Sequence, residues 1–170
     1  MSTDLHRPAA VAGMFYPGSA SVLSNEVAAM LAGVDVAEGA PAKALIVPHA
    51  GYVYSGPIAA SAYACLAPLR KKIRRVILLG PTHRVAVRGL AVSSASAFDT
   101  PLGSVPVHAA LRDAVLKLPQ VRCNDDAHAL EHSLEVQLPF LQSVLDAFTL
   151  LPLAVGQASD AEVAEVLECV

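Results

Sequence analysis

The chain has 170 residues, 54% of them hydrophobic, and carries a formal net charge of −3 at neutral pH. This length suits one compact domain with a sizeable core, and we predict a single α/β domain over 1–170. Because no apolar run reaches the roughly 18 residues of a membrane span and the net charge is negative, we expect neither a membrane nor a nucleic acid as a partner.

The first half of the chain predicts helices that alternate with apolar strands. A helix is expected over 23–31, and an Ala-rich helix from about 55 to 69 that tolerates Pro57 in its first turn. The runs at 43–47 and 75–79 are short, apolar and followed by Pro or Gly. This pattern is typical of central strands in a parallel sheet.

The second half continues the alternation. Helices are predicted over 109–118, over 127–148 with an interruption at Pro139, and from Ser159 onward. Extended segments are predicted between them, over 89–93, 105–107 and 149–155. This order of elements indicates an α/β fold.

A histidine follows each of the two predicted central strands. His49 comes after the run at 43–47, and His83 after the run at 75–79. Ligands bind at the carboxyl ends of strands in such sheets, so we expect the two imidazoles to converge on a metal ion. The alternative is a pair of buried, hydrogen-bonded histidines. A carboxylate as a further ligand would favour Fe(II), and a thiolate would favour a softer metal.

A second group of polar residues lies between 128 and 135. At 100° per residue, the side chains that share one face of a helix are His128, Glu131, His132 and Glu135. One interpretation is a solvated surface, and the other is a cavity wall that supplies proton donors, acceptors or partners to a metal ligand. The stretch also matches H-x-x-E-H, the inverted zinc-peptidase pattern.

Two tyrosines, Tyr52 and Tyr54, alternate beside His49. Tyrosines in such turns commonly pack with the hydroxyl group reaching solvent. If His49 binds a metal, either ring can contact a substrate, and we predict both as substrate-binding residues.

The cysteines at 65, 123 and 169 are widely spaced and form no CxxC pair, which favours reduced thiols. Residues 1–8 lack the charged-then-apolar layout of a secretion signal. Both features predict a cytoplasmic protein.

Five blocks of the chain resemble the Memo family, whose bacterial members are often called AmmeMemoRadiSam system protein B. The blocks occur in the family's order, at 7–17, 48–56, 80–83, 100–103 and 131–141. The family is similar in fold to class III extradiol (LigB-like) dioxygenases, which implies a three-layer α/β/α arrangement around a mostly parallel central sheet. Those enzymes hold non-haem Fe(II) with two histidines and a carboxylate, and cleave catechol-type rings with O₂.

The resemblance also assigns roles to residues. His49 and His83 align with the two metal-binding histidines, and His132 and Glu135 lie in the block beside the same pocket, which implies catalytic roles for them. Family members are longer than this chain, and a later cysteine completes their metal pocket. Cys169 comes too early to match it. The resemblance therefore implies that 1–170 lacks the C-terminal portion of the domain and the third metal ligand.

We accordingly hypothesise a non-haem, metal-dependent, dioxygenase-like oxidoreductase that acts on a small aromatic or enediol substrate. Iron (Fe²⁺) is the expected metal, with zinc or copper as alternatives. One competing hypothesis is a non-catalytic module that binds a peptide or another ligand on the same scaffold. The other is a zinc hydrolase that uses His128, Glu131 and His132. A homo-oligomer is compatible with the sequence.

Overall fold

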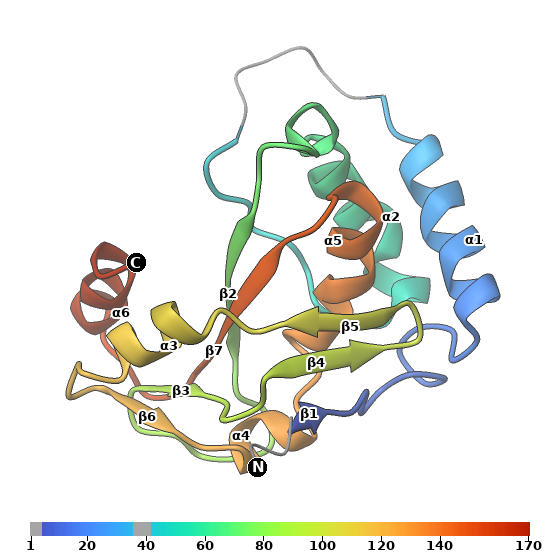
Figure 1. Ribbon diagram of the computed structural model, residues 1–170. Coiled ribbons are helices and arrows are strands. Elements are labelled where there is room, and N and C mark those ends of the chain that lie inside the picture. The colour runs from blue at the N-terminus through green and yellow to red at the C-terminus, as the bar shows by residue number, and fades with distance from the viewer. Residues whose placement is uncertain (1–4, 36–41) are drawn as a thin grey trace.

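The structure is a computed structural model that describes residues 5–35 and 42–170. The first four residues of the segment inspected for a secretion signal lie outside these ranges. Within them, the strands form two sheets (Figure 1). The larger sheet has the order β2 (Arg75–Pro81), β7 (Thr149–Val155), β3 (Leu90–Val92) and β6 (Val121–Cys123). The smaller sheet has the order β1 (His6–Arg7), β4 (Ala97–Thr100) and β5 (Gly103–Pro106).

Both sheets mix parallel and antiparallel pairs. Strand β2 runs parallel to β7, with Arg75 opposite Thr149 and Pro81 opposite Val155. The pairs β3–β6 and β1–β4 are also parallel, whereas β3–β7 and β4–β5 are antiparallel. The α/β class is confirmed, and the predicted parallel arrangement holds for β2 and β7, the pair that leads to His83.

Helices lie on both sides of the larger sheet (Figure 1). On one side are α1 (Ala20–Ala32), α2 (Tyr52–Ala64) and α5 (Leu138–Val144), and on the other are α3 (Ala109–Val115) and α6 (Asp160–Glu168). The remaining helical segments are short: η1 (Ala67–Leu69), α4 (Asp126–Ala129) and η2 (Glu135–Gln137). In the described ranges, no helix combines the length and the apolar character needed to cross a membrane.

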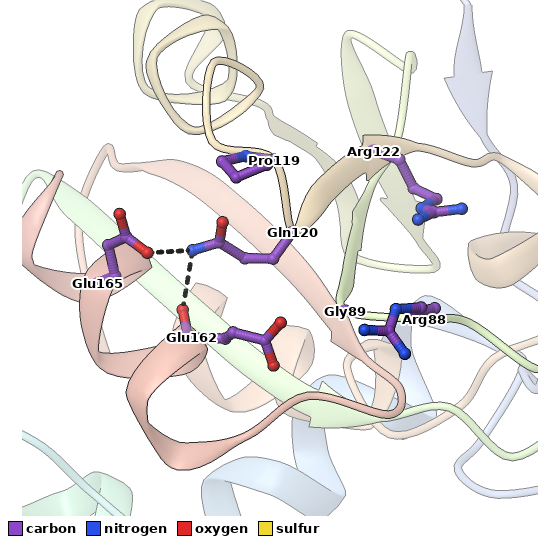
Figure 2. A pocket seen from close by; sticks show the side chains of 7 residues that line it. All are labelled: Arg88, Gly89, Pro119, Gln120, Arg122, Glu162 and Glu165. Atoms are coloured by element: carbon purple, nitrogen blue, oxygen red, sulfur yellow. Dashed lines mark hydrogen bonds between the residues drawn. The ribbon is translucent and has the colours of Figure 1, made fainter.

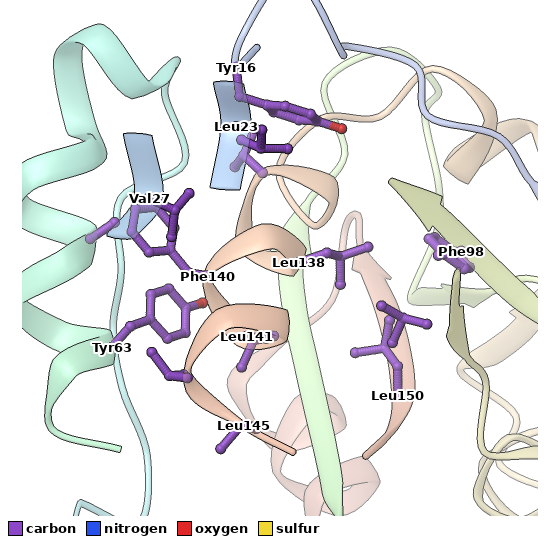
Figure 3. Close-up of a cluster of buried hydrophobic side chains, with 14 of the residues drawn as sticks. Tyr16, Leu23, Val27, Tyr63, Phe98, Leu138, Phe140, Leu141, Leu145 and Leu150 are labelled. Atoms are coloured by element: carbon purple, nitrogen blue, oxygen red, sulfur yellow. The ribbon is translucent and has the colours of Figure 1, made fainter. Parts of the chain in front are cut away.

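Strand β7 separates two hydrophobic clusters, because successive residues of a strand point to opposite faces. Leu150 belongs to the larger cluster, together with side chains of α1, α2 and α5 (Figure 3). Leu151 belongs to a second cluster, with Val115 of α3 and Val166 of α6. Each face of β7 is therefore covered by its own helical layer, which gives a three-layer α/β/α arrangement.

Several predicted elements are confirmed with small changes at their ends. The strand predicted over 149–155 is β7, and the strand predicted over 75–79 extends to Pro81 as β2. Helix α6 begins after Ser159, whose hydroxyl accepts a hydrogen bond from the backbone N–H of Glu162 in a reciprocal capping box. Strands β1, β4 and β6 are short and were not predicted.

The strand predicted over 43–47 is wrong. This segment is irregular, and it forms no ladder with another strand of the described chain. Leu45 and Val47 pack against the larger cluster, whereas Ile46 is fully exposed. The side chains alternate as they would in a strand, but an apolar run becomes one only when a neighbouring backbone pairs with its N–H and C=O groups.

The continuous helix predicted over 127–148 is also wrong. Helix α4 ends at Ala129, a turn follows, and η2 leads into α5, where Pro139 occupies the first turn. The second helix of the chain, α2, begins at Tyr52 rather than near Ser55, so Pro57 lies inside it. These changes move polar side chains away from the positions that a regular helix would give them.

Candidate metal centre

Three histidines from separate segments converge at one end of the larger sheet. One ring nitrogen each of His49, His83 and His132 lie within 4.8 Å of one another. The ring centres are 5.3 Å apart for His49 and His83, 5.8 Å for His49 and His132, and 4.5 Å for His83 and His132. The predicted convergence of His49 and His83 is confirmed, and the structure adds His132 as a third nitrogen donor.

The position of His49 is set by contacts on both sides of it. The carbonyl oxygen of Pro48 accepts a hydrogen bond of 3.1 Å from the side-chain amide of Gln137, and the hydroxyl of Tyr63 donates to the other end of that amide. After His49, the backbone N–H of Tyr52 donates to the carbonyl of Phe15 at 2.8 Å. His49 is thereby held without belonging to a strand.

The position of His83 follows from strand β2. Thr82, directly after β2, donates its N–H to the carbonyl of Val155 at 3.0 Å, which continues the β2–β7 pairing toward the histidine. At Gly80 a Cβ atom would lie 2.7 Å from the hydroxyl oxygen of Ser133, so a side chain would push the two segments apart. Ser133 instead approaches closely and donates to the carbonyl of Pro81 at 2.9 Å.

A buried carboxylate, Glu131, connects the segments that carry His83 and His132. Its side chain accepts hydrogen bonds from the backbone N–H (2.6 Å) and the ring Nδ1 (2.9 Å) of His83. It also accepts from the backbone N–H groups of His132 (2.8 Å) and Ser133 (2.9 Å). An ionised carboxylate only accepts hydrogen bonds, so the ring proton of His83 lies on Nδ1 and its Nε2 keeps a free lone pair.

The charge states suit a metal centre. Burial alone would raise the pKa of Glu131, but hydrogen bonds from Ser133 and His83 outweigh it and lower the pKa to about 2. Burial, and then the neighbouring His83, lower the pKa of His49. Burial also lowers the pKa of His132, against the opposing effect of Glu131. Neutral imidazoles are the form that binds a metal.

The three nitrogens fit a transition-metal ion. Metal–nitrogen bonds of about 2.1 Å place two ligand nitrogens about 3.4 Å apart in a tetrahedral site. The three nitrogens lie within 4.8 Å of one another, so the rings must move closer together to reach that spacing around a bound ion. Imidazole donors suit zinc, copper, iron and nickel, so the donor set does not distinguish among these metals.

A cavity of about 540 Å³ opens beside the histidines. Its lining is largely apolar and includes Phe15, Pro48, His49, Tyr54 and His132. The ring of Phe15 lies 4.7 Å from the ring of His132, centre to centre. Tyr54 therefore lies at the wall of a cavity next to two of the three histidines, and its substrate-binding role stays a prediction.

A second cavity, of about 330 Å³, lies between β3, β6 and α6 (Figure 2). It is lined by charged and polar side chains, and its Gln120 amide donates to the carboxylate of Glu165 and to the carbonyl of Glu162. No histidine or cysteine lines it. We place the functional site at the first cavity because the clustered nitrogen donors lie there.

Glu135 and Tyr52 lie in the protein interior rather than at the cavity. The Glu135 side chain is fully buried, forms an ion pair with Arg7, and accepts hydrogen bonds from Tyr16 and from the backbone N–H groups of Ala10 and Val11. Tyr52 is 3% exposed, and its hydroxyl donates to a backbone carbonyl at 2.8 Å. These contacts favour structural roles, although the catalytic role of Glu135 and the substrate-binding role of Tyr52 stay predictions.

His128 does not join the other histidines. It is 1% exposed, its Nε2 lies 3.0 Å from the carbonyl oxygen of Ala91, and its ring meets the edge of Phe98. The turn after α4 breaks the helix that would have placed His128 and His132 on one face. The structure thus contradicts the zinc-hydrolase arrangement of His128, Glu131 and His132, since Glu131 instead holds the backbone and ring of His83.

Comparison with known proteins identifies the family of the chain. A sequence profile described as Memo-like protein matches residues 7–170. The chain belongs to the Memo family. Among its Memo relatives, a "MEMO1 family protein" of Aquifex aeolicus is 42% identical over 88% of this chain, and one of Ignicoccus hospitalis is 40% identical over 88%. A third, from Methanosarcina mazei, is 37% identical over 94% of this chain.

This Memo-family chain spans 54% to 58% of the length of those three relatives. Within the chain, alternate side chains of the block at 131–137 form hydrogen bonds with distant segments. Glu131 accepts from His83, Ser133 donates to Pro81, Glu135 accepts from Arg7, and Gln137 donates to Pro48. Sequence reasoning recognised the polar character of this block but assigned it to one face of a regular helix, whereas the block consists of a turn followed by η2.

Proposed function

We propose that this Memo-family chain binds one divalent transition-metal ion between His49, His83 and His132 and takes part in oxidoreductase chemistry of the dioxygenase type. The observation that supports the proposal is the convergence of three imidazole nitrogens within 4.8 Å beside an apolar cavity. The substrate we propose is a small aromatic or enediol compound. Its flat apolar body would suit a cavity walled by Phe15 and Tyr54.

Iron is the metal we propose, with zinc and copper as alternatives. The likeness of the Memo family to class III extradiol dioxygenases favours iron, which would supply activation of O₂ toward an electron-rich substrate. Three imidazoles leave further coordination positions open. A site with open positions is suited to catalysis, whereas a structural metal site is closed by its protein ligands.

The residues of the chain have distinct roles in this proposal. His49, His83 and His132 supply nitrogen donors, and the contacts of Glu131 keep the Nε2 atom of His83 free to bind. The apolar wall of the cavity would contact the body of the substrate beside the histidines. The catalytic role first expected of His132 stays a prediction, but its place beside the other two histidines supports a ligand role more directly.

Metal content tests this proposal. Protein purified anaerobically with Fe²⁺ is expected to hold about one metal ion per chain, and the variants His49→Ala, His83→Ala and His132→Ala are each expected to lose most of it. His6→Ala is the matched control, because His6 lies at the surface beside Asp99. Absence of bound metal from the wild-type chain would refute the proposal. Retention of the metal by a variant that carries all three substitutions would refute it as well.

A second candidate is a binding module that performs no oxidation. The observation that favours it is the exposure of large apolar side chains near the cavity: Tyr54 is 84% exposed and Val53 is 88% exposed. Oxygen consumption over a panel of catechols separates the two candidates. Silence across the panel, together with retained metal and measurable binding of an apolar peptide, would favour the module.

A further inference from the structure

At the metal centre, the Glu131 side chain contacts both the segment after β2 and the turn after α4. It is 2% exposed and lies between His83 and His132. Its Oε2 accepts from the backbone N–H of His83, and its Oε1 accepts from the ring of His83 and from the backbone of His132 and Ser133. A movement of this carboxylate would therefore move both histidines.

Every one of these four partners is an N–H donor. A carboxylate satisfies all four because both of its oxygens only accept hydrogen bonds. A glutamine at this position would direct its NH₂ group at an N–H group, whichever way the amide is turned. A buried donor without an acceptor loses about 1–3 kcal/mol of stabilisation. The donor set thus specifies a carboxylate at position 131, rather than any polar side chain of similar size.

We propose that Glu131 is a positioning residue that couples His83 and His132 and fixes the Nδ1–H tautomer of His83, so that the metal meets a preorganised pair of donors. The inference rests on the proposed metal site and adds what holds the ligands in place before the metal arrives. Partners of this kind usually change metal affinity by about 10–100-fold when they are replaced.

Affinity measured for Co²⁺ alone, by titration of the full chain and by the absorption bands of the bound ion, tests the coupling. Glu131→Gln is expected to weaken Co²⁺ binding about 10–100-fold. The same substitution should add its full effect in a His49→Ala background, because Glu131 does not contact His49. In a His83→Ala background its effect should fall well below additivity. Glu165→Gln is the control, since Glu165 contacts Gln120 in the other cavity.

A purely structural loss would weaken Co²⁺ binding equally in both histidine backgrounds, and that result would overturn the inference.

Because Glu131→Gln can also impair folding, a second measurement uses the wild-type chain. Long-range ¹H–¹⁵N spectra of the metal-free protein above pH 7 should show His83 protonated at Nδ1, and an Nε2–H tautomer would refute the inference. If the wild-type chain binds no Co²⁺, the proposed function fails; if it binds through the histidines and Glu131→Gln leaves affinity unchanged, only the role of Glu131 fails.

Discussion

Replacement of Glu135 by glutamine should strongly destabilise the folded chain. Glu135 is fully buried and forms an ion pair with Arg7, which is itself 5% exposed. The other donors to Glu135 are the hydroxyl of Tyr16 at 2.5 Å and the backbone N–H groups of Ala10 at 2.8 Å and Val11 at 3.0 Å. A neutral amide would leave the Arg7 charge without its partner and place an NH₂ group against donors.

The magnitude follows from the burial of both partners. Removal of one member of a buried ion pair costs about 3–5 kcal/mol, because the other charge remains in a low-dielectric interior without compensation. Domains of this size have a total unfolding free energy of about 5–15 kcal/mol. Glu135→Gln should therefore remove a large part of the stability of the chain, and at the upper end of the range it should prevent stable folding.

Urea unfolding at pH 7 measures this loss. Glu168→Gln is the matched control, since Glu168 is exposed at the end of α6, and it should change the unfolding free energy by less than about 0.5 kcal/mol. The double variant Arg7→Met with Glu135→Gln should recover part of the loss, because the uncompensated charge is gone. A loss below about 1 kcal/mol for Glu135→Gln would refute the structural role and return Glu135 to the list of catalytic candidates.

Three further outcomes are expected. Burial lowers the pKa of His128 from 6.5 to about 4, so the unfolded chain binds more protons than the folded chain between these values. The unfolding free energy should therefore fall by about 2 kcal/mol from pH 7.5 to pH 5. His128→Gln should reduce this difference in urea unfolding at the two pH values, and a difference equal to that of the wild type would contradict the prediction. Gly89→Ala should lower the unfolding free energy by more than about 3 kcal/mol, because φ is +75° and a Cβ atom would lie 2.0 Å from a backbone oxygen. Gly103→Ala should lower it by less, because φ is also positive there but the space around the Cβ position is open. Tyr52→Phe should lower the unfolding free energy by about 1–2 kcal/mol with no change in metal affinity, and a change in affinity would contradict the purely structural role of Tyr52.

The sequence predicted those parts of the fold that depend on local patterns. Strand β7 is a run of seven apolar or β-branched residues, and α6 begins with a capping box, so both could be located within one or two residues. The segment at 43–47 has the same apolar character as β7 but no pairing partner in the described chain. Strand formation there depends on a distant backbone, which a local pattern does not report.

The candidate site could be predicted only in part, because some of its contacts join residues that are distant in the sequence. His49 and His83 follow the two apolar runs, and their convergence could be inferred from the position of sites in α/β sheets. His132 was placed near them by resemblance, but its ring joins the cluster because a turn, rather than a helix, follows α4. The role of Glu131 depends on four N–H groups, two of which belong to a residue 48 positions away in sequence. Sequence spacing cannot indicate such a contact.

The most direct test of the account is the location of the metal. Crystals of the chain grown anaerobically with Fe²⁺ should give one strong anomalous peak, about 2.1 Å from a nitrogen atom each of His49, His83 and His132. A peak at His128 or at a cysteine, or a metal bound by His49 and His83 with His132 turned away, would contradict the proposed centre.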